Sequence, residues 1–204
     1  MNLALFDFDG TITTGDTFVP FVRFAMRPAR MPIATARFLP VGIGYQLGWV
    51  SAAQARPVLV RLALGGEQSA RVADLGLSYA RTVVPGVVRR EAIDRIKWHK
   101  GQGDLVVVVS GSLYTYLSHW CRPLGVDLIC TQLEERNGAL TGRYAGRDCI
   151  GPEKVTRIRE RYDLAAYPVI YAYGDTDDDR EMLELAHKKY YRWTEAPGFA
   201  HTSE

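Results

Sequence analysis

Leu3–Thr13, LALFDFDGTIT, is the stretch that decides the fold. Its first part, Leu3 to Phe8, is a short and nearly continuous apolar run, which is typical of a parallel strand buried on both faces. Asp7 and Asp9 stand two positions apart, so on a strand their carboxylates point the same way. Open α/β sheets bind ligands beyond the carboxyl ends of their strands, and the pair lies at such an end. The stretch therefore predicts an α/β protein with a site built around two aspartates.

Two neighbouring carboxylates repel each other unless a cation or a proton lies between them, so the pair predicts a divalent metal ion or two separated pKa values. Gly10 permits a tight turn close to a bound anion, and Thr11 offers a hydroxyl and an N–H group there. A calcium-binding loop is excluded, because a strand precedes the pair and Phe18 occupies the position of the bidentate glutamate. Taken alone, the pair is explained equally well by two solvated aspartates in a turn.

Length and composition fit a globular protein with one core and a small accessory domain. The chain has 204 residues, of which 47% are hydrophobic and 24% charged, and these values lie in the globular range. The three cysteines, Cys121, Cys130 and Cys149, lack CxxC spacing, so we expect buried thiols in a reducing cytosol. No basic region precedes the first apolar run, and a signal peptide is not expected.

A helical insertion is predicted between the first and second strands. Apolar residues recur at helical spacing from Phe18 to Ala25, and Ala52–Leu64 and Glu67–Arg81 also have helical patterns. The segment from Phe38 to Ala55 contains no charged residue. Its glycines and proline argue against a membrane span, and we expect a buried helix there, with a segment lying at a membrane surface as the alternative.

The charge of the chain is distributed unevenly. The net charge is +2, but Thr17 to Val83 has eight arginines against Glu67 and Asp74, a balance of +6 that leaves −4 for the rest. Arginines on solvated helix faces explain such a segment, and so does contact with an anionic partner. Four of the arginines directly precede the uncharged segment and would favour an anionic membrane surface as that partner: Arg23, Arg27, Arg30 and Arg37.

A second anion-binding motif follows the next predicted strand. Leu105 to Val109, LVVVV, is a buried parallel strand by its length and β-branching. It leads into Ser110, Gly111 and Ser112 and then into a helix, so hydroxyl and N–H groups converge as they do in anion sites at helix N-termini. A simple helix cap by either serine explains the same residues.

The C-terminal half adds a lysine and an acidic cluster. After a strand at 126–131 and a hairpin turning at 137–138, a helix at 151–162 carries Lys154 near its start. The strand 168–173 then runs into four aspartates in five positions, and a helix follows at 180–187. A magnesium ion suits this cluster better than calcium, because the glycine and the final glutamate of a calcium loop are missing. The cluster consists of Asp175, Asp177, Asp178 and Asp179.

FDFDGT resembles the first motif of the haloacid dehalogenase (HAD) superfamily of phosphohydrolases, and the serine, lysine and acidic motifs follow in the order of that superfamily. The insertion is similar to the helical C1 cap of subfamily IB, the phosphoserine-phosphatase-like group. The resemblance implies a Rossmann-like parallel sheet with helices on both faces, formed by residues 1–16 and 84–204, and a helical cap formed by residues 17–83.

By this resemblance Asp7 is the nucleophile, Asp9 is the general acid and base, and Ser110 and Lys154 hold the phosphoryl group. Mg²⁺ is expected at Asp7, the Asp9 carbonyl and Asp175. Asp179 is expected to lie behind the direct metal ligands and to orient a metal-bound water or Lys154. Asp178 stands where the subgroup often has asparagine. We expect it next to the metal ligands, and its contact with the phosphate is left open. The expected substrate contacts are Gly10, Thr11, Asp16, Gly111 and Ser112.

The resemblance implies a small phosphorylated metabolite as substrate, such as phosphoserine. Asp16 occupies the position of the glutamate that grips the amine in phosphoserine phosphatases. A second resemblance, to HAD-type phosphatidylglycerophosphatases, rests on DTFVPFVRF, the apolar cap stretch FLPVGIGYQLGWV, GPEKV and the pair Arg192 and Trp193. It implies a phospholipid headgroup as the alternative substrate. A phosphotransferase with the same intermediate is the third alternative. We expect a cytoplasmic protein that contacts the inner face of an anionic membrane through its basic cap, with no nucleic acid and no obligate protein partner.

Overall fold

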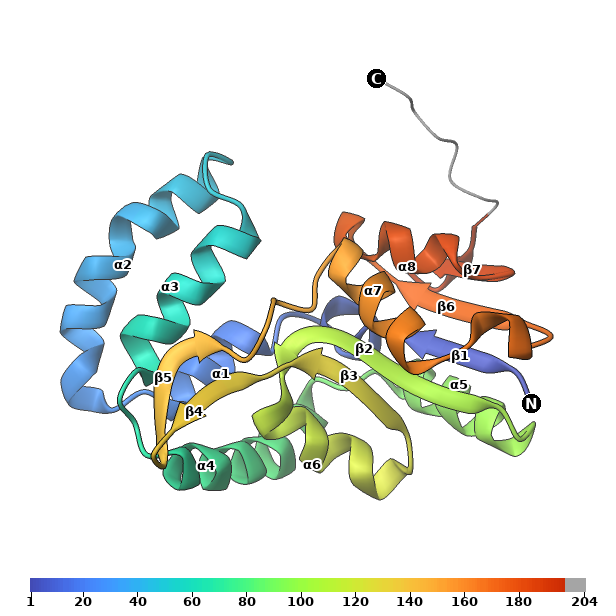
Figure 1. The fold of residues 1–204 in the computed structure, drawn as a ribbon, viewed down its shortest axis with the longest axis horizontal. Coiled ribbons are helices and arrows are strands. Elements are labelled where there is room, and N and C mark those ends of the chain that lie inside the picture. Colours follow the sequence, from blue (N-terminus) through green and yellow to red (C-terminus); the bar gives the residue numbers. More distant parts are fainter. Residues whose placement is uncertain (197–204) are drawn as a thin grey trace.

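The computed structural model describes residues 1–196, which form a six-stranded sheet with helices on both faces and a helical cap beside it (Figure 1). The sheet has the order β3-β2-β1-β6-β7-β8, and its strands are parallel except β8, which is antiparallel to β7. The fold is thus the predicted Rossmann-like α/β arrangement. The strands are β1 (Leu3–Phe6), β2 (Leu105–Leu113), β3 (Asp127–Thr131), β6 (Ile170–Gly174), β7 (Lys188–Tyr191) and β8 (Thr194–Glu195).

Alternate residues of β1 face opposite layers of helices. Leu3 and Leu5 pack with α7 (Pro152–Arg161) and α8 (Arg180–Glu184), whereas Ala4 and Phe6 pack with α5 (Arg90–Gly101) and α6 (Tyr114–Leu124). All four β1 side chains are fully buried. This double burial explains why the strand is a continuous apolar run instead of an alternating one.

The register of the sheet determines where the functional residues meet. Phe6, the last residue of β1, pairs with Val108 of β2 on one side and with Tyr173 of β6 on the other. The residues that follow these three strands therefore lie at one edge. That edge is the carboxyl end of the parallel sheet, where the sequence predicts the site.

The cap consists of α1 (Phe18–Ala25), α2 (Met31–Gln46), α3 (Ala52–Leu64) and α4 (Ser69–Thr82). The ring of Phe21 in α1 lies 4.8 Å from that of Tyr116 in α6, and Gly76 in α4 abuts the carbonyl of Thr115. Two cap helices are therefore packed against the core, while α2 and α3 extend away from the sheet in Figure 1. The hairpin β4 (Leu133–Arg136) and β5 (Ala139–Tyr144) lies along α3.

The two ends of the insertion lie side by side. Thr14 donates its N–H to the Val87 carbonyl at 2.8 Å, and Arg89 donates its N–H to the Ile12 carbonyl at 2.9 Å. Thr13 and Val88 form an antiparallel bridge between these two hydrogen bonds. The chain therefore leaves the core and returns to it through one short double linker.

Glu67 is the electrostatic centre of the cap. It is 2% exposed and accepts ion pairs from Arg27 at 2.8 Å, Arg30 at 3.5 Å and Arg71 at 3.1 Å. Three of the eight cap arginines therefore surround one buried carboxylate. Arg56 pairs outside the cap, with Asp148 at 3.0 Å, so the surplus charge available at the cap surface is smaller than the sequence count implies.

The expected burial of the uncharged segment 38–55 is wrong. The segment is divided between the end of α2, a turn and the start of α3, and several of its large side chains face solvent. Among residues 1–196, α2 packs chiefly on α3, so much of the rest of its surface is left uncovered by the described part of the chain. Within residues 1–196, no helix is long and apolar enough to cross a membrane. The exposed fractions are 58% for Leu39, 46% for Ile43, 55% for Leu47 and 77% for Trp49.

Candidate active site

The site is centred on the buried ammonium group of Lys154. Its Nζ donates to Oδ1 of Asp7 at 2.6 Å and to Oδ1 of Asp179 at 2.6 Å. Lys154 lies in the first turn of α7, and Asp7 directly follows β1. Both are almost fully buried, with exposed fractions of 2% and 6%. A lysine in such a position requires neighbouring anions, because an unpaired buried charge is costly.

A tight turn brings Asp175 against the end of β1. Gly10 has φ +84°, and a Cβ added there would lie 2.2 Å from Oδ2 of Asp175, so glycine is required for both its conformation and its size. The Thr11 hydroxyl donates to Oδ1 of Asp175 at 2.9 Å. Of the two predicted substrate contacts in this turn, Gly10 thus makes room for Asp175 and Thr11 holds it.

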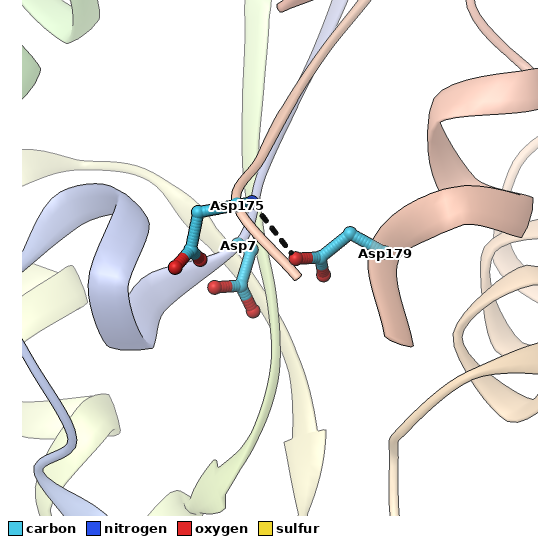
Figure 2. A group of neighbouring side chains, drawn as sticks. All are labelled: Asp7, Asp175 and Asp179. Carbon is cyan, nitrogen blue, oxygen red and sulfur yellow. Dashed lines mark hydrogen bonds between the residues drawn. The ribbon is translucent and has the colours of Figure 1, made fainter. Parts of the chain in front are cut away.

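Three carboxylates lie close enough to share one metal ion. Oxygen atoms of Asp7, Asp175 and Asp179 all lie within 4.8 Å of one another. Figure 2 shows the three side chains converging, with Asp175 donating its backbone N–H to Asp179. Asp179 therefore stands within the carboxylate group itself, in addition to contacting Lys154.

The electrostatic state of the cluster reflects its burial. Burial raises the pKa of Asp7 well above its usual value, and repulsion from Asp179 adds to the increase against the attraction of Lys154. Burial also raises the pKa of Asp175. Burial opposes the charge of Asp179 as well, but Lys154 and the N–H groups of Thr176 and Asp175 lower its pKa overall. Three carboxylates facing one ammonium group leave negative charge that a divalent cation would neutralise.

Asp9 lies apart from this cluster and is held by hydroxyl groups. Its Oδ1 accepts the N–H of Thr17 at 2.6 Å and the Thr17 hydroxyl at 2.5 Å, and its Oδ2 accepts the Ser112 hydroxyl. Burial raises the pKa of Asp9, although these hydrogen bonds act in the opposite direction. The Thr17 hydroxyl also lies 2.7 Å from the hydroxyl of Tyr116, and the Thr17 carbonyl accepts from Tyr79 at 3.1 Å. The carboxylate is thus fixed by Thr17 at the cap boundary and by Ser112 at the end of β2.

The end of β2 forms the third side of the site. Ser110 is 1% exposed, and its Oγ accepts the N–H of Ser112 at 2.9 Å. The carbonyl of Gly111 accepts a hydrogen bond from the guanidinium of Arg56 in the cap. Of the two serines flanking Gly111, Ser110 stabilises the irregular end of β2 and Ser112 contacts Asp9.

Two predicted residues lie at the margin. Asp16 is exposed and accepts the N–H groups of Phe18 at 3.2 Å and Val19 at 3.0 Å, so it caps α1. Asp178 is exposed on the turn after β6, and within residues 1–196 its carboxylate has no hydrogen-bond or ion-pair partner. Asp177, its neighbour, pairs with Arg180 at 3.2 Å.

Sequence analysis missed two residues that the structure brings to the site. Thr17 binds Asp9, and the signal that could have identified it is its place as a hydroxyl residue directly before the first cap helix. Arg56 contacts Gly111 from the middle of α3. No local pattern distinguishes it from the other cap arginines, because its partners lie far away along the chain.

Comparisons with known proteins identify a family and a fold for the chain. Residues 4–184 match the family model described as haloacid dehalogenase-like hydrolase. The protein CicA of Caulobacter vibrioides is 31% identical over 192 residues, which cover 93% of this chain and 85% of CicA. The "Probable phosphatase Rv3661" of Mycobacterium tuberculosis is 37% identical over 105 residues, 50% of this chain and 36% of that protein.

Solved structures show the same fold. A protein of unknown function from Bordetella pertussis Tohama I superposes with a TM-score of 0.77 at 24% identity, covering 93% of this chain and 89% of that one. A phospho-aspartyl intermediate analogue of phosphoserine phosphatase superposes with a TM-score of 0.66 at 22% identity, covering 93% and 85%. The match to the family model extends from β1 to α8 and includes the carboxylates and the lysine of the site. The chain therefore belongs to the haloacid dehalogenase-like hydrolase family.

Proposed function

We propose that this HAD-type phosphatase hydrolyses a phosphate monoester in two displacements, with Asp7 as the nucleophile and Asp9 as the general acid and base. The observation that supports this best is the contact of Lys154 with both Asp7 and Asp179 at 2.6 Å. A cation there favours the ionised form of the nucleophile. It also offers positive charge to a phosphoryl group that approaches Asp7.

In the first displacement an oxygen of Asp7 attacks phosphorus, and the bond between phosphorus and the leaving oxygen breaks. Asp9, whose pKa burial raises, supplies a proton to that oxygen. In the second displacement water attacks the phosphorus of the aspartyl phosphate. Asp9 takes a proton from the water, the phosphate leaves and the Asp7 carboxylate is restored.

The donor set fits Mg²⁺, because this ion prefers carboxylate oxygens and the cluster has unbalanced negative charge. Asp7 and Asp175 would hold it together with the Asp9 carbonyl, and Asp179 would orient Lys154 and the backbone beside them. When bound, the cation would neutralise the repulsion between an anionic nucleophile and an anionic phosphate. Ser110, the Gly111 N–H and Lys154 would hold the phosphoryl oxygens.

For the substrate we propose a small phosphorylated metabolite, with phosphoserine as the first compound to test. Three solved structures with this fold are of phosphoserine phosphatase, one of them with substrate bound. The exposed position of Asp16 at the start of α1 leaves part of its carboxylate open to a substrate amine. A phospholipid headgroup is the alternative substrate, and the exposed apolar side chains of α2 support contact with a membrane surface there.

The function is tested by trapping the intermediate. Asp7→Asn should abolish turnover of an aryl phosphate in the presence of Mg²⁺, because the variant lacks the anionic nucleophile. Asp177→Asn is the matched control, since Asp177 is an exposed aspartate outside the carboxylate group. When the substrate carries radioactive phosphorus and the reaction is quenched with acid, the wild-type protein should retain label as an aspartyl phosphate. Hydroxylamine should remove this label, and Asp7→Asn should carry none.

Persistent turnover by purified Asp7→Asn would show that Asp7 is not the nucleophile. Product analysis separates the phosphotransferase alternative: a hydrolase releases free phosphate, whereas a transferase in the presence of alcohols places most of the phosphate on the acceptor.

A further inference from the structure

An apolar cavity of about 640 Å³ lies between α1, α2 and α3. Small-molecule sites typically measure about 300–1,000 Å³, so the cavity is large enough for a ligand. Its charged side chains are Asp16, Arg23 and Arg56, and they are few beside the apolar wall. The wall is formed mainly by Phe18, Met26, Ala34, Phe38, Ala55 and Leu59.

The cavity adjoins the proposed catalytic residues through its lining. Arg56, which lines it, stacks on the Phe18 ring at 3.7 Å and donates to the Gly111 carbonyl near the end of β2. Phe18 directly follows Thr17, whose N–H and hydroxyl bind Asp9. The cavity is therefore connected through the side chain of Arg56 to the proposed phosphoryl site, and through Phe18 and Thr17 to Asp9, the proposed general acid.

The proposed reaction fixes which part of the substrate faces the cavity. The leaving oxygen must lie beside Asp9, because Asp9 protonates it. The carbon skeleton attached to that oxygen then continues past Thr17 and Phe18, on the side where the cavity begins. The apolar walls favour a hydrocarbon there, since its binding removes the apolar surface of the hydrocarbon and that of the cavity wall from water.

We propose that the cavity binds the hydrocarbon part of the leaving group, so that the preferred substrates are phosphate monoesters of alcohols with an aliphatic chain. The proposal rests on the proposed phosphatase function and adds a specificity site to it. Tyr45, which also lines the cavity, is 53% exposed. An aliphatic chain longer than the cavity could extend past Tyr45 into solvent or into a membrane. A soluble amphiphile and a membrane lipid therefore both have the required chemistry.

The test uses the full protein with Mg²⁺ and linear alkyl phosphates from ethyl to decyl, each below its micelle-forming concentration. We expect kcat/KM to increase about threefold to fourfold per methylene until the cavity is filled, a factor that corresponds to about 0.8 kcal/mol per buried methylene. The change should appear mainly in KM, because the chain binds equally in the ground and transition states. A flat dependence on length, with ethyl phosphate hydrolysed, would overturn the proposal and leave the phosphatase function standing.

Two alanines of α2 provide a matched pair of variants. Ala34 is 4% exposed and lines the cavity, whereas Ala36 is exposed on the same helix and does not line it. In Ala34→Phe the ratio of kcat/KM for octyl phosphate to that for ethyl phosphate should fall at least tenfold. In Ala36→Phe it should stay at the wild-type value. Equal ratios in the two variants would contradict the assignment, and the ratio is insensitive to the amount of folded protein.

Direct binding distinguishes failure of this site from failure of the phosphatase function. If no alkyl phosphate is hydrolysed, calorimetry with decylphosphonate and ethylphosphonate still tests the cavity. Tighter binding of decylphosphonate that is lost in Ala34→Phe supports the proposed site. Equal binding of the two phosphonates by the wild type overturns it. Short-chain phosphatidic acid, as monomers and in neutral vesicles, separates the two sources of substrate. Chain-length discrimination among monomers supports the cavity, while hydrolysis confined to vesicles without such discrimination overturns it.

Discussion

Asp7 and Asp175 come from distant parts of the chain and meet because they directly follow β1 and β6, two paired strands of one parallel sheet, whereas Lys154 reaches them from the first turn of α7. Parallel strands place their carboxyl ends at one edge, so the positions of the two aspartates after strands predicted that they would meet. The hydrogen bonds of Asp9 could not be predicted. They depend on the path of the backbone between Gly10 and Thr17, which follows from packing and not from a local pattern.

Asp175 and Asp177 have different surroundings despite their proximity in the sequence. Asp175 is half-buried within the carboxylate group, and Asp177 is exposed. Asp175→Ala should therefore raise the Mg²⁺ concentration required for half-maximal activity by at least about tenfold, because one of few protein ligands is lost. Asp177→Ala should change it less than twofold. Magnesium titration of phosphatase activity measures both, and equal effects would mean that the ion does not bind at Asp175.

Helices were easier to predict than the edge of the sheet. The helix Ala52–Leu64 was predicted with its observed bounds, and the turn at 137–138 joins β4 and β5 as predicted. β7 and β8 were missed because Lys188–Tyr191 has no apolar run, as is common for strands near an edge. The predicted strand Leu3–Phe8 ends earlier, at Phe6, because the tight turn starting at Phe8 takes up its last residues.

The contact between α4 and α6 depends on one glycine. A Cβ on Gly76 would lie 2.2 Å from the Thr115 carbonyl oxygen, so Gly76→Ala must push the two helices apart. We expect a loss of about 1–3 kcal/mol in the free energy of unfolding, as for other overpacked contacts. Gly101→Ala is the control, because a Cβ there meets no atom within 4 Å. Urea denaturation of both variants measures the difference, and equal stabilities would show that the helices separate without cost.

At the scale of the whole molecule, the exposed arginines of the cap allow a test of contact with an anionic membrane. Arg27 and Arg30 are bound to Glu67, so the arginines to test are Arg23 and Arg37, which are exposed and within residues 1–196 have no ion-pair partner. Each basic residue near an anionic surface contributes about 1 kcal/mol within a Debye length of roughly 8 Å. Replacing both by glutamine should weaken binding to anionic vesicles about thirtyfold, measured by sedimentation at low salt.

Neutral vesicles and added salt are the controls for this experiment, since both remove the electrostatic attraction. Arg90→Gln offers a second control, because Arg90 is an exposed arginine on α5 in the core. Wild-type protein that sediments equally with anionic and neutral vesicles would rule out an electrostatic contact. The soluble phosphomonoester would then be the substrate class to pursue.

The stability of the whole fold should depend on pH through His99. This residue is fully buried, with Nδ1 2.9 Å from Asp104 and Nε2 2.9 Å from the Tyr173 hydroxyl. Burial lowers the pKa of His99 from its ordinary value of 6.5, so the folded state binds this proton less tightly than the unfolded state. The contribution to stability is present above pH 6.5 and is lost as the pH falls below it, by up to about 1.4 kcal/mol per pH unit.

Urea denaturation at several pH values between 7.5 and 4.5 tests this dependence. His99→Gln should be less stable than the wild type at pH 7.5 but should show a flatter slope below 6.5, because the group that titrates is absent. An unchanged slope in the variant would assign the pH dependence to other groups. The pKa of Asp104 is also lowered: burial opposes this, but hydrogen bonds from His99 and the Asn2 N–H outweigh it. Its contribution is lost only at lower pH, below 3.8.

The double linker pairs Thr14 with Val87 and Ile12 with Arg89. This pairing affects how such a protein can evolve. From the viewpoint of the sheet, the entire cap takes the place of one short loop, because the chain departs and returns at hydrogen-bonded neighbours. Recombination at this point can exchange one recognition module for another without altering strand register. An imported module must still supply a donor for Asp9 and a helix face that fits α6, which limits the modules that the chemistry accepts.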